Sequence, residues 1–270
     1  MPRLSVICPV YNSNPIFLNQ SLSSVILSCP EDSELLVGLD GPCNADCYRV
    51  LERISKKQSR VHVKILPYPR QGLVATLNCL LESCDCEYIA RQDSDDISLP
   101  SRIMQQLKTM EEVKNLDFCG TQILRAMEDL KPIKIQRRYP QHMKPQLIYS
   151  SILNNPIAHP TLMIRRESLG NILYRDYPGM EDWDLYLQLW ESGRCSANLD
   201  QTGLVYRLHS QQITAGKKDQ ILVEECQRRS AFILSSRHPE FGFMKSLGRI
   251  SSKLKLNSVG NRLKQSLERL

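Results

Sequence analysis

Apolar runs and helical segments alternate through the first third of the chain, and this alternation limits the possible folds more than any other feature. The apolar runs are 4–10, 34–40, 61–66 and 87–90, and the segments with helical spacing between them are 15–29, 45–57 and 72–84. Strands that are apolar along their whole length and joined by helices are typical of a parallel sheet with helices on both faces. We therefore predict an α/β fold with a mostly parallel sheet.

The second half of the chain is less regular. We expect strands at 118–124, 161–164 and 204–208, a helix at 181–191, and a basic loop through Arg137 and Arg138. A chain of 270 residues is long enough for one large domain with a deep cleft. We predict one domain over 1–240, divided into halves of about 1–115 and 116–240, and a separate tail at 241–270.

Charge and composition argue against several classes of protein. Lys and Arg total 35 against 29 acidic residues, and this excess is too small and too dispersed to indicate nucleic-acid binding. None of the ten cysteines forms a C-x-x-C pair, so we expect reduced thiols. The chain begins with a strand pattern rather than a signal peptide, and no apolar stretch approaches the roughly 20 residues of a membrane span. These features predict a cytoplasmic protein whose membrane contact is at most peripheral.

Three turn sequences follow the predicted strands at their carboxyl ends. They are Pro9 to Asn12, Asp40-Gly41-Pro42, and Asp93-Ser94-Asp95-Asp96. Ligands of open parallel sheets bind outside the carboxyl ends of the strands. We therefore expect the three turns to converge on one crevice.

The acidic cluster is the strongest candidate for chemistry. Two carboxylates 4 Å apart repel each other by about 4 kcal/mol at the effective dielectric of a protein surface. A hard divalent cation, Mg²⁺ or Mn²⁺, relieves this repulsion when it is held by one or two carboxylates and by substrate phosphates. The alternative is a solvated acidic loop that caps the helix expected after Pro100.

Several motifs, taken in order, resemble the family 2 glycosyltransferases of the GT-A fold. They span about residues 4–214 and are SVICPVYN, LVGLDGP, RQGLVATLN, RQDSDDISLPSR, NPIAHPTLMIRR, EDWDLYLQLWESG and YRLHSQQIT. Any one of them is weak evidence, whereas seven in the right order are strong. The resemblance implies a Rossmann-like, mostly parallel sheet flanked by helices, with a nucleotide-sugar donor half at 1–115, an irregular acceptor half at 116–240 and a C-terminal helical tail.

The resemblance assigns the strand ends to the donor. It implies that Asp40 accepts a hydrogen bond from the pyrimidine of a uridine nucleotide and that Tyr11 stacks on this base. The alternative for Asp40 is a cap of its own turn. The neighbouring Pro9 and Asn12 are expected to line the same nucleotide-sugar site.

The loop before the third predicted helix is also assigned to the donor. Arg70 and Gly72 precede a helix N-terminus, a natural place for a diphosphate. The family usually has Asn where Gln71 stands, and this chain lacks the serine that commonly follows the Asp-Gly pair, which leaves the role of Gln71 open.

The acidic cluster becomes the D-x-D motif of the family. Asp93, Ser94 and Asp95 are expected at the nucleotide sugar, and Asp95 or Asp96 at the metal, with Asp95 favoured. His209 is a candidate third metal ligand or diphosphate contact, against the alternative of an ordinary loop histidine.

The resemblance places the acceptor chemistry at the predicted helix 181–191. Asp182 is the expected catalytic base, which takes the proton of the acceptor hydroxyl, and Glu181 is expected to orient the acceptor. The alternative is that both are acidic residues favoured at a helix N-terminus. His159 and Trp183 are expected on the acceptor side, and for His159 a plain loop role is the alternative.

The tail is basic and has helical apolar spacing. Residues 241–270 carry seven Lys or Arg against one acid, Glu268. Such a helix can lie on an anionic membrane, each basic residue contributing about 1 kcal/mol near the surface. The alternative is packing on the domain or on a partner.

Together these features predict an inverting, metal-dependent transfer of a sugar from a nucleoside-diphosphate sugar, with UDP favoured, to a saccharide or lipid-linked glycan. The enzyme would act in cell-surface polysaccharide synthesis, in the cytoplasm at the inner face of the membrane. One alternative is a nucleotidyltransferase, but the loop at 9–15 lacks the glycine and lysine that such an enzyme needs. The other is a non-catalytic nucleotide-sugar-binding protein.

Overall fold

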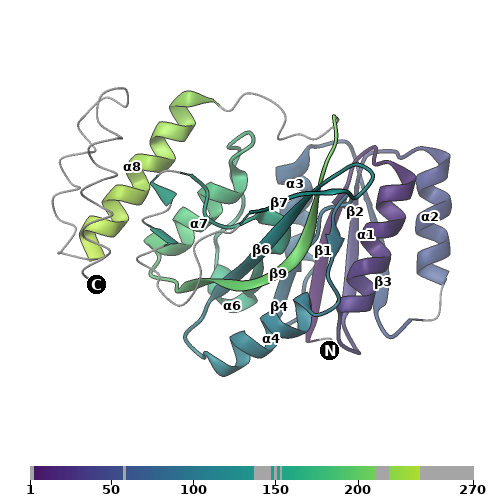
Figure 1. The fold of residues 1–270 in the computed structure, drawn as a ribbon, viewed down its shortest axis with the longest axis horizontal. Helices are drawn as coiled ribbons and strands as arrows, with labels where there is room; N and C mark the ends of the chain where they lie inside the picture. Colours follow the sequence, from purple (N-terminus) through teal and green to yellow (C-terminus); the bar gives the residue numbers. More distant parts are fainter. Residues whose placement is uncertain are drawn as a thin grey trace.

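The predicted alternation forms the core of a mixed sheet in a computed structural model (Figure 1). The structure describes residues 3–56, 59–136, 147–148, 151–152, 154–210 and 219–237. The basic loop at Arg137 and Arg138 and the tail at 241–270 lie outside the described residues, so the predictions made for them stay predictions.

The first four strands and the helices between them lie close to their predicted positions. They are β1 (Leu4–Val10), α1 (Pro15–Ser28), β2 (Glu34–Asp40), α2 (Ala45–Lys56), β3 (His62–Tyr68), α3 (Leu73–Glu82) and β4 (Tyr88–Arg91). β1 pairs in parallel with both β2 and β4, and β2 pairs in parallel with β3. The predicted parallel arrangement is therefore confirmed for this half.

The remaining elements extend the sheet and cover it. They are β5 (Ile97–Ser98), α4 (Arg102–Glu112), β6 (Phe118–Met127), β7 (Pro132–Gln136), η1 (His159–Thr161), β8 (Met163–Arg165), α6 (Arg166–Leu169), α7 (Glu181–Glu191), β9 (Ser196–Leu208) and α8 (Gln220–Arg237). The strand order is β3-β2-β1-β4-β8-β6-β9-β5, with β7 beside β6.

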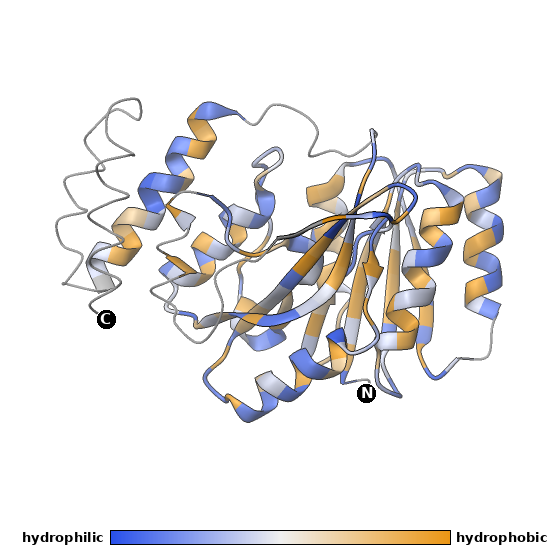
Figure 2. Ribbon diagram, viewed as in Figure 1, coloured by the Kyte–Doolittle hydropathy of each residue, from blue (hydrophilic) through white to orange (hydrophobic). Residues whose placement is uncertain are grey.

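Both faces of the central strands are buried, which explains why they are apolar along their length. In β2, Leu36 packs into one hydrophobic cluster with α3 and α7, while Leu35 and Val37 pack into another with α1 and α2. Figure 2 shows the apolar colour along the strands and in stripes on the helices. The sheet is therefore a layer between two cores.

The directions of the strands place several of their carboxyl ends at the same edge of the sheet. β8 is antiparallel to both β4 and β6, and β6 is parallel to β9. β1, β2, β4 and β9 consequently run the same way, and their carboxyl ends share one edge of the sheet.

Several elements differ from the sequence-based prediction. β3 alternates exposed and half-buried residues instead of being buried throughout, because it lies at the end of the sheet. β9 begins at Ser196 rather than 204, because the strand continues through a polar middle at Asp200 and Gln201, where its pairing with β6 shifts register. The short strands β5 and β7 and the helix α8 were not predicted. Among the described residues, no helix has the length and apolar character needed to cross a membrane.

Candidate active site

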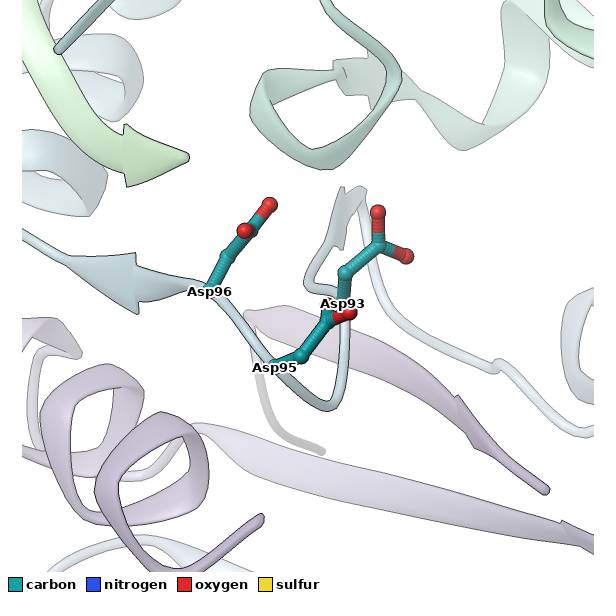
Figure 3. A group of neighbouring side chains, drawn as sticks. All are labelled: Asp93, Asp95 and Asp96. Carbon is teal, nitrogen blue, oxygen red and sulfur yellow. The ribbon is translucent and has the colours of Figure 1, made fainter. Parts of the chain in front are cut away.

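Three aspartates lie on one turn that follows β4 (Figure 3). Asp93, Asp95 and Asp96 each offer a carboxylate oxygen, and these atoms all lie within 4.8 Å of one another. Asp96 is 1% exposed, whereas Asp93 and Asp95 are partly exposed. The turn therefore presents closely spaced oxygen ligands at the edge where the strands end.

Gln92 braces this turn from its buried side. Its Nε2 donates to the carbonyl oxygens of Asp93 and Asp96 at 3.2 and 3.0 Å, and lies 2.9 Å from Ser21 Oγ. Ser21 Oγ in turn donates to the Asp93 carbonyl at 2.5 Å. Nothing in the sequence predicts this role for Gln92, because the backbone atoms and the Ser21 side chain that it contacts are brought together only by the fold.

The end of β9 holds the same turn from another side. Arg207 donates from its backbone N to Asp96 Oδ1 at 2.9 Å and from its Nε to the Asp95 carbonyl at 2.8 Å. His209 Nε2 lies 2.7 Å from Asp95 Oδ2. The structure thus brings His209 to the acidic turn, and it adds Arg207, which was not predicted as a site residue.

Burial and like charge act against the ionised carboxylates. Burial and then the charge of Asp93 raise the pKa of Asp95, although His209 opposes this shift. Burial and then the charges of Asp95 and Asp93 raise the pKa of Asp96 well above its usual value. Both shifts mark a site where negative charge needs compensation.

Asp96 supplies the test of whether a cation fits. Its Oδ2 atom is buried and has no hydrogen-bond partner among the residues that the structure describes. A buried carboxylate oxygen without a donor is costly unless a cation satisfies it. The donor set is all oxygen apart from the imidazole of His209, which suits Mn²⁺ or Mg²⁺.

The loop after β1 lies against the acidic turn. Ser13 Oγ lies 2.7 Å from Ser94 Oγ, and Asn12 adopts a left-handed backbone conformation with φ of 43°. Tyr11 is 51% exposed, with the Arg70 guanidinium 3.4 Å from the centre of its ring. Pro9 is buried within β1, two residues before Tyr11.

Asp40 organises the loop before α3. It is 3% exposed, forms an ion pair with Arg70, and accepts hydrogen bonds from the backbone N atoms of Gln71 and Gly72 at 2.7 and 3.0 Å. The amides that the sequence assigned to a diphosphate therefore bind Asp40. A Cβ at Gly41, where φ is 87°, would lie 3.2 Å from Arg70 Cβ, so this approach depends on glycine.

Glu181 and Asp182 begin α7, as predicted. Burial and then the charge of Asp182 raise the pKa of Glu181 to about 7. His159 Nδ1 lies 3.9 Å from Glu181 Oε1, and His159 Nε2 lies 2.9 Å from Tyr174 Oη. Burial and then the charge of Arg91 lower the pKa of His159 well below its usual value, so its imidazole is neutral.

Asp182 is held at both carboxylate oxygens. Asn155 Nδ2 donates to Oδ2 at 2.6 Å, and the backbone N of Trp183 donates to Oδ1 at 2.7 Å. The Trp183 side chain is 1% exposed and donates from Nε1 to Ser151 Oγ at 2.6 Å. α7 directs this indole into the core, so Trp183 offers almost no surface to a ligand, and its place on the acceptor side stays a prediction.

Arg91 connects the two groups of carboxylates. Its buried guanidinium lies 2.6 Å from Asp93 Oδ1. The pKa of Glu181 also responds to both members of this pair: the positive charge of Arg91 acts to lower it, and the negative charge of Asp93 acts to raise it. The acidic turn and the start of α7 therefore share one electrostatic site.

Three comparisons with known proteins bear on this site. A family model described as Glycosyl transferase family 2 matches residues 5–173. The O-antigen biosynthesis glycosyltransferase WbnJ of Escherichia coli is 30% identical over 240 residues, covering 84% of this chain and 86% of WbnJ.

Solved structures show the same fold. Staphylococcus aureus TarS in complex with UDP-GlcNAc superposes with a TM-score of 0.67 at 17% identity, covering 91% of this chain and 70% of that one. The mannosyltransferase PcManGT from Pyrobaculum calidifontis, in complex with GDP-Man and Mn²⁺, gives 0.61 at 14% identity, covering 97% and 80%. The predicted GT-A fold is confirmed by this likeness.

Proposed function

This chain belongs to glycosyl transferase family 2, and from that premise we propose that it is a metal-dependent, inverting enzyme. It moves a sugar from a nucleoside-diphosphate sugar, with UDP as the favoured nucleotide, to a hydroxyl of a saccharide or lipid-linked glycan. The observation that carries the proposal is the buried Asp96 Oδ2, which has no hydrogen-bond partner within the described part of the chain. It lies beside Asp93 and Asp95, in the same electrostatic site as Asp182.

The acidic turn holds the donor. Asp95 and Asp96 are the proposed ligands of Mn²⁺ or Mg²⁺, with His209 beside them. When bound, such a cation supplies positive charge to the diphosphate leaving group. Asp93, paired with Arg91, and Ser94, paired with Ser13, line the same turn on the nucleotide-sugar side.

The nucleotide is proposed to lie over the loops after β1 and β2. Tyr11 offers a half-exposed ring for the base, and Asn12 follows it on the same loop. Asp40 supports this surface by fixing the loop at 70–72, from which the Arg70 guanidinium reaches the ring.

The acceptor is proposed to bind above α7. Its hydroxyl oxygen attacks the anomeric carbon, the bond from that carbon to the diphosphate breaks, and the electron pair leaves with the diphosphate. Asp182 takes the hydroxyl proton. Glu181, with a pKa of about 7, is partly protonated near neutral pH and orients the acceptor together with His159.

The biological setting is proposed from the relatives. WbnJ is named for O-antigen biosynthesis, and a role in cell-surface polysaccharide synthesis is proposed here by the same reasoning. We also propose that the enzyme acts in the cytoplasm at the inner face of the membrane. In this proposal the tail at 241–270 contacts lipid.

A screen of nucleotide sugars with and without Mn²⁺ or Mg²⁺ tests the proposal, run on wild type, Asp95→Ala and Asp182→Asn. Asp95→Ala should weaken nucleoside-diphosphate binding only when metal is present. Asp182→Asn should keep this binding and lose transfer. A wild type that binds no nucleoside diphosphate with either metal contradicts the proposal, and binding without any transfer or hydrolysis favours a non-catalytic binding protein.

A further inference from the structure

Asn155 makes a side-chain contact with Asp182 that the proposed mechanism does not use. Asn155 Nδ2 lies 2.6 Å from Asp182 Oδ2, on the opposite side from the Trp183 amide that donates to Oδ1 at 2.7 Å. We propose that Asn155 is a positioning residue that fixes the rotation of the Asp182 carboxylate and favours its ionised form. This inference rests on the proposed function, because it takes Asp182 as the base.

A hydrogen bond within its own loop fixes the orientation of the Asn155 amide. Asn155 Oδ1 accepts from the backbone N of Ile157 at 3.3 Å, an Asx-type turn across Pro156. With the oxygen used by the backbone, the NH₂ group is the end that faces Asp182. The assignment of amide oxygen and nitrogen therefore follows from two contacts that agree.

The segment that carries Asn155 is seated firmly on the sheet. Ile157 is fully buried, and a Cβ added to Gly120 in β6 would lie 2.5 Å from its Cγ2. Asn155 itself is 8% exposed. A buried amide on a rigid segment holds a carboxylate with little loss of side-chain entropy, as a catalytic group requires.

Other ionisable groups face Asp182 from several elements. Glu181 is its neighbour on α7, and the charge of Asp182 contributes to the raised pKa of Tyr174 in the preceding loop and of Cys226 on α8. Arg91 and Asp93 act on both Glu181 and Tyr174 from the end of β4. Asn155 is uncharged, so any change in ionisation caused by its removal reflects the lost donor.

Two substitutions of Asn155 distinguish an effect on the position of the Asp182 carboxylate from an effect on folding of the protein. Asn155→Asp keeps an oxygen that can accept from Ile157 but places a carboxylate where the donor stood, whereas Asn155→Ala loses both contacts. Asn154→Ala is the matched control, since Asn154 Oδ1 binds the Asn155 backbone N at 3.0 Å within the same turn. All three are compared with wild type in the presence of metal, by thermal unfolding, nucleoside-diphosphate binding and transfer rate against pH.

The loss of a hydrogen bond to a charged group lowers kcat of Asn155→Ala by about 10- to 100-fold, with KM for the donor unchanged. The acid limb of its pH–rate profile moves to higher pH, because the ionised carboxylate has lost a donor. Asn155→Asp moves this limb further, since like charges in contact favour the protonated form. Asn154→Ala follows the wild-type profile.

Unchanged kcat and superimposable pH profiles in both Asn155 variants would overturn the inference. So would an Asn154→Ala variant that matches Asn155→Ala, because the effect would then belong to the turn. If Asp182→Asn transfers sugar as well as wild type does, the assignment of the base fails instead. An inactive Asp182→Asn beside fully active Asn155 variants removes only the inference about Asn155.

Discussion

His209 Nε2 lies 2.7 Å from Asp95 Oδ2 and joins the chain just after β9 to the turn after β4. The imidazole also packs beside Phe17 of α1, with 5.5 Å between ring centres. The side chain is 13% exposed, so its position is set by the protein rather than by solvent. In the proposed metal site, His209 would therefore either ligate the cation directly or orient the carboxylate of Asp95.

Replacing His209 tests this contact. His209→Ala should weaken Mn²⁺ binding by about tenfold, because partners that orient metal-ligating carboxylates contribute on this scale. Calorimetric titration of Mn²⁺ in the presence of UDP measures the effect. His62→Ala, an exposed histidine on β3, is the control. Equal Mn²⁺ affinity in the His209 variant and wild type would remove His209 from the metal site.

Glu181 makes stability depend on pH. Its pKa is about 7 in the folded protein against 4.5 for the ordinary group, so the folded state retains a proton that the unfolded state releases. The unfolded state therefore binds fewer protons between these values, and stability falls as pH rises through this window. Across the whole window, Glu181 lowers the free energy of unfolding by at most about 3 kcal/mol, since each pKa unit corresponds to about 1.4 kcal/mol.

Glu181→Gln should flatten this decline. Urea unfolding of wild type and variant at pH values below 4.5 and above 7 measures the difference. Glu128→Gln, at an exposed glutamate, should leave the wild-type pH dependence in place. If Glu181→Gln shows the same decline as wild type, Glu181 is not the group responsible.

Gly203 in β9 lies where no side chain fits. A Cβ there would be 2.4 Å from Thr121 Oγ1 and 2.7 Å from Arg102 Cγ, and both residues are fully buried. Gly203→Ala should therefore destabilise the fold by about 1–3 kcal/mol through overpacking. Thermal unfolding measures the loss, with Thr202→Ala as the neighbouring control. A melting temperature equal to that of wild type would show that β9 can shift at no cost.

The order of elements and the edge of the sheet that carries the site could be predicted because buried strands must be apolar on both faces. This pattern alone predicts that Asp40 and the turn at 93–96 lie at the same edge. The supports of the site could not be predicted. Gln92 and Arg207 both donate to backbone carbonyl oxygens of the turn, and Asn155 contacts a residue 27 positions away, so each contact depends on tertiary placement.

Two other differences have local causes. The apolar and polar residues of α8 do not keep to separate sides, so periodicity gave no sign of that helix. Trp183 follows Asp182 directly on α7, and adjacent helical residues point about 100° apart, which turns one toward the site and the other into the core. Adjacency in sequence to a candidate site residue is therefore poor evidence for a shared role on a helix.

The hydrogen bonds from Arg207 to the acidic turn have a consequence for synthesis of the chain. The turn at 93–96 leaves the ribosome early, but the backbone N and guanidinium that hold Asp95 and Asp96 arrive more than a hundred residues later. A nascent chain that ends before Arg207 contains Asp93, Asp95 and Asp96 and the contacts of Gln92, but it lacks the hydrogen bonds that Arg207 donates. If the turn holds a cation as proposed, this capacity is acquired late in translation, and a split protein divided between the two halves should regain it only on reassembly.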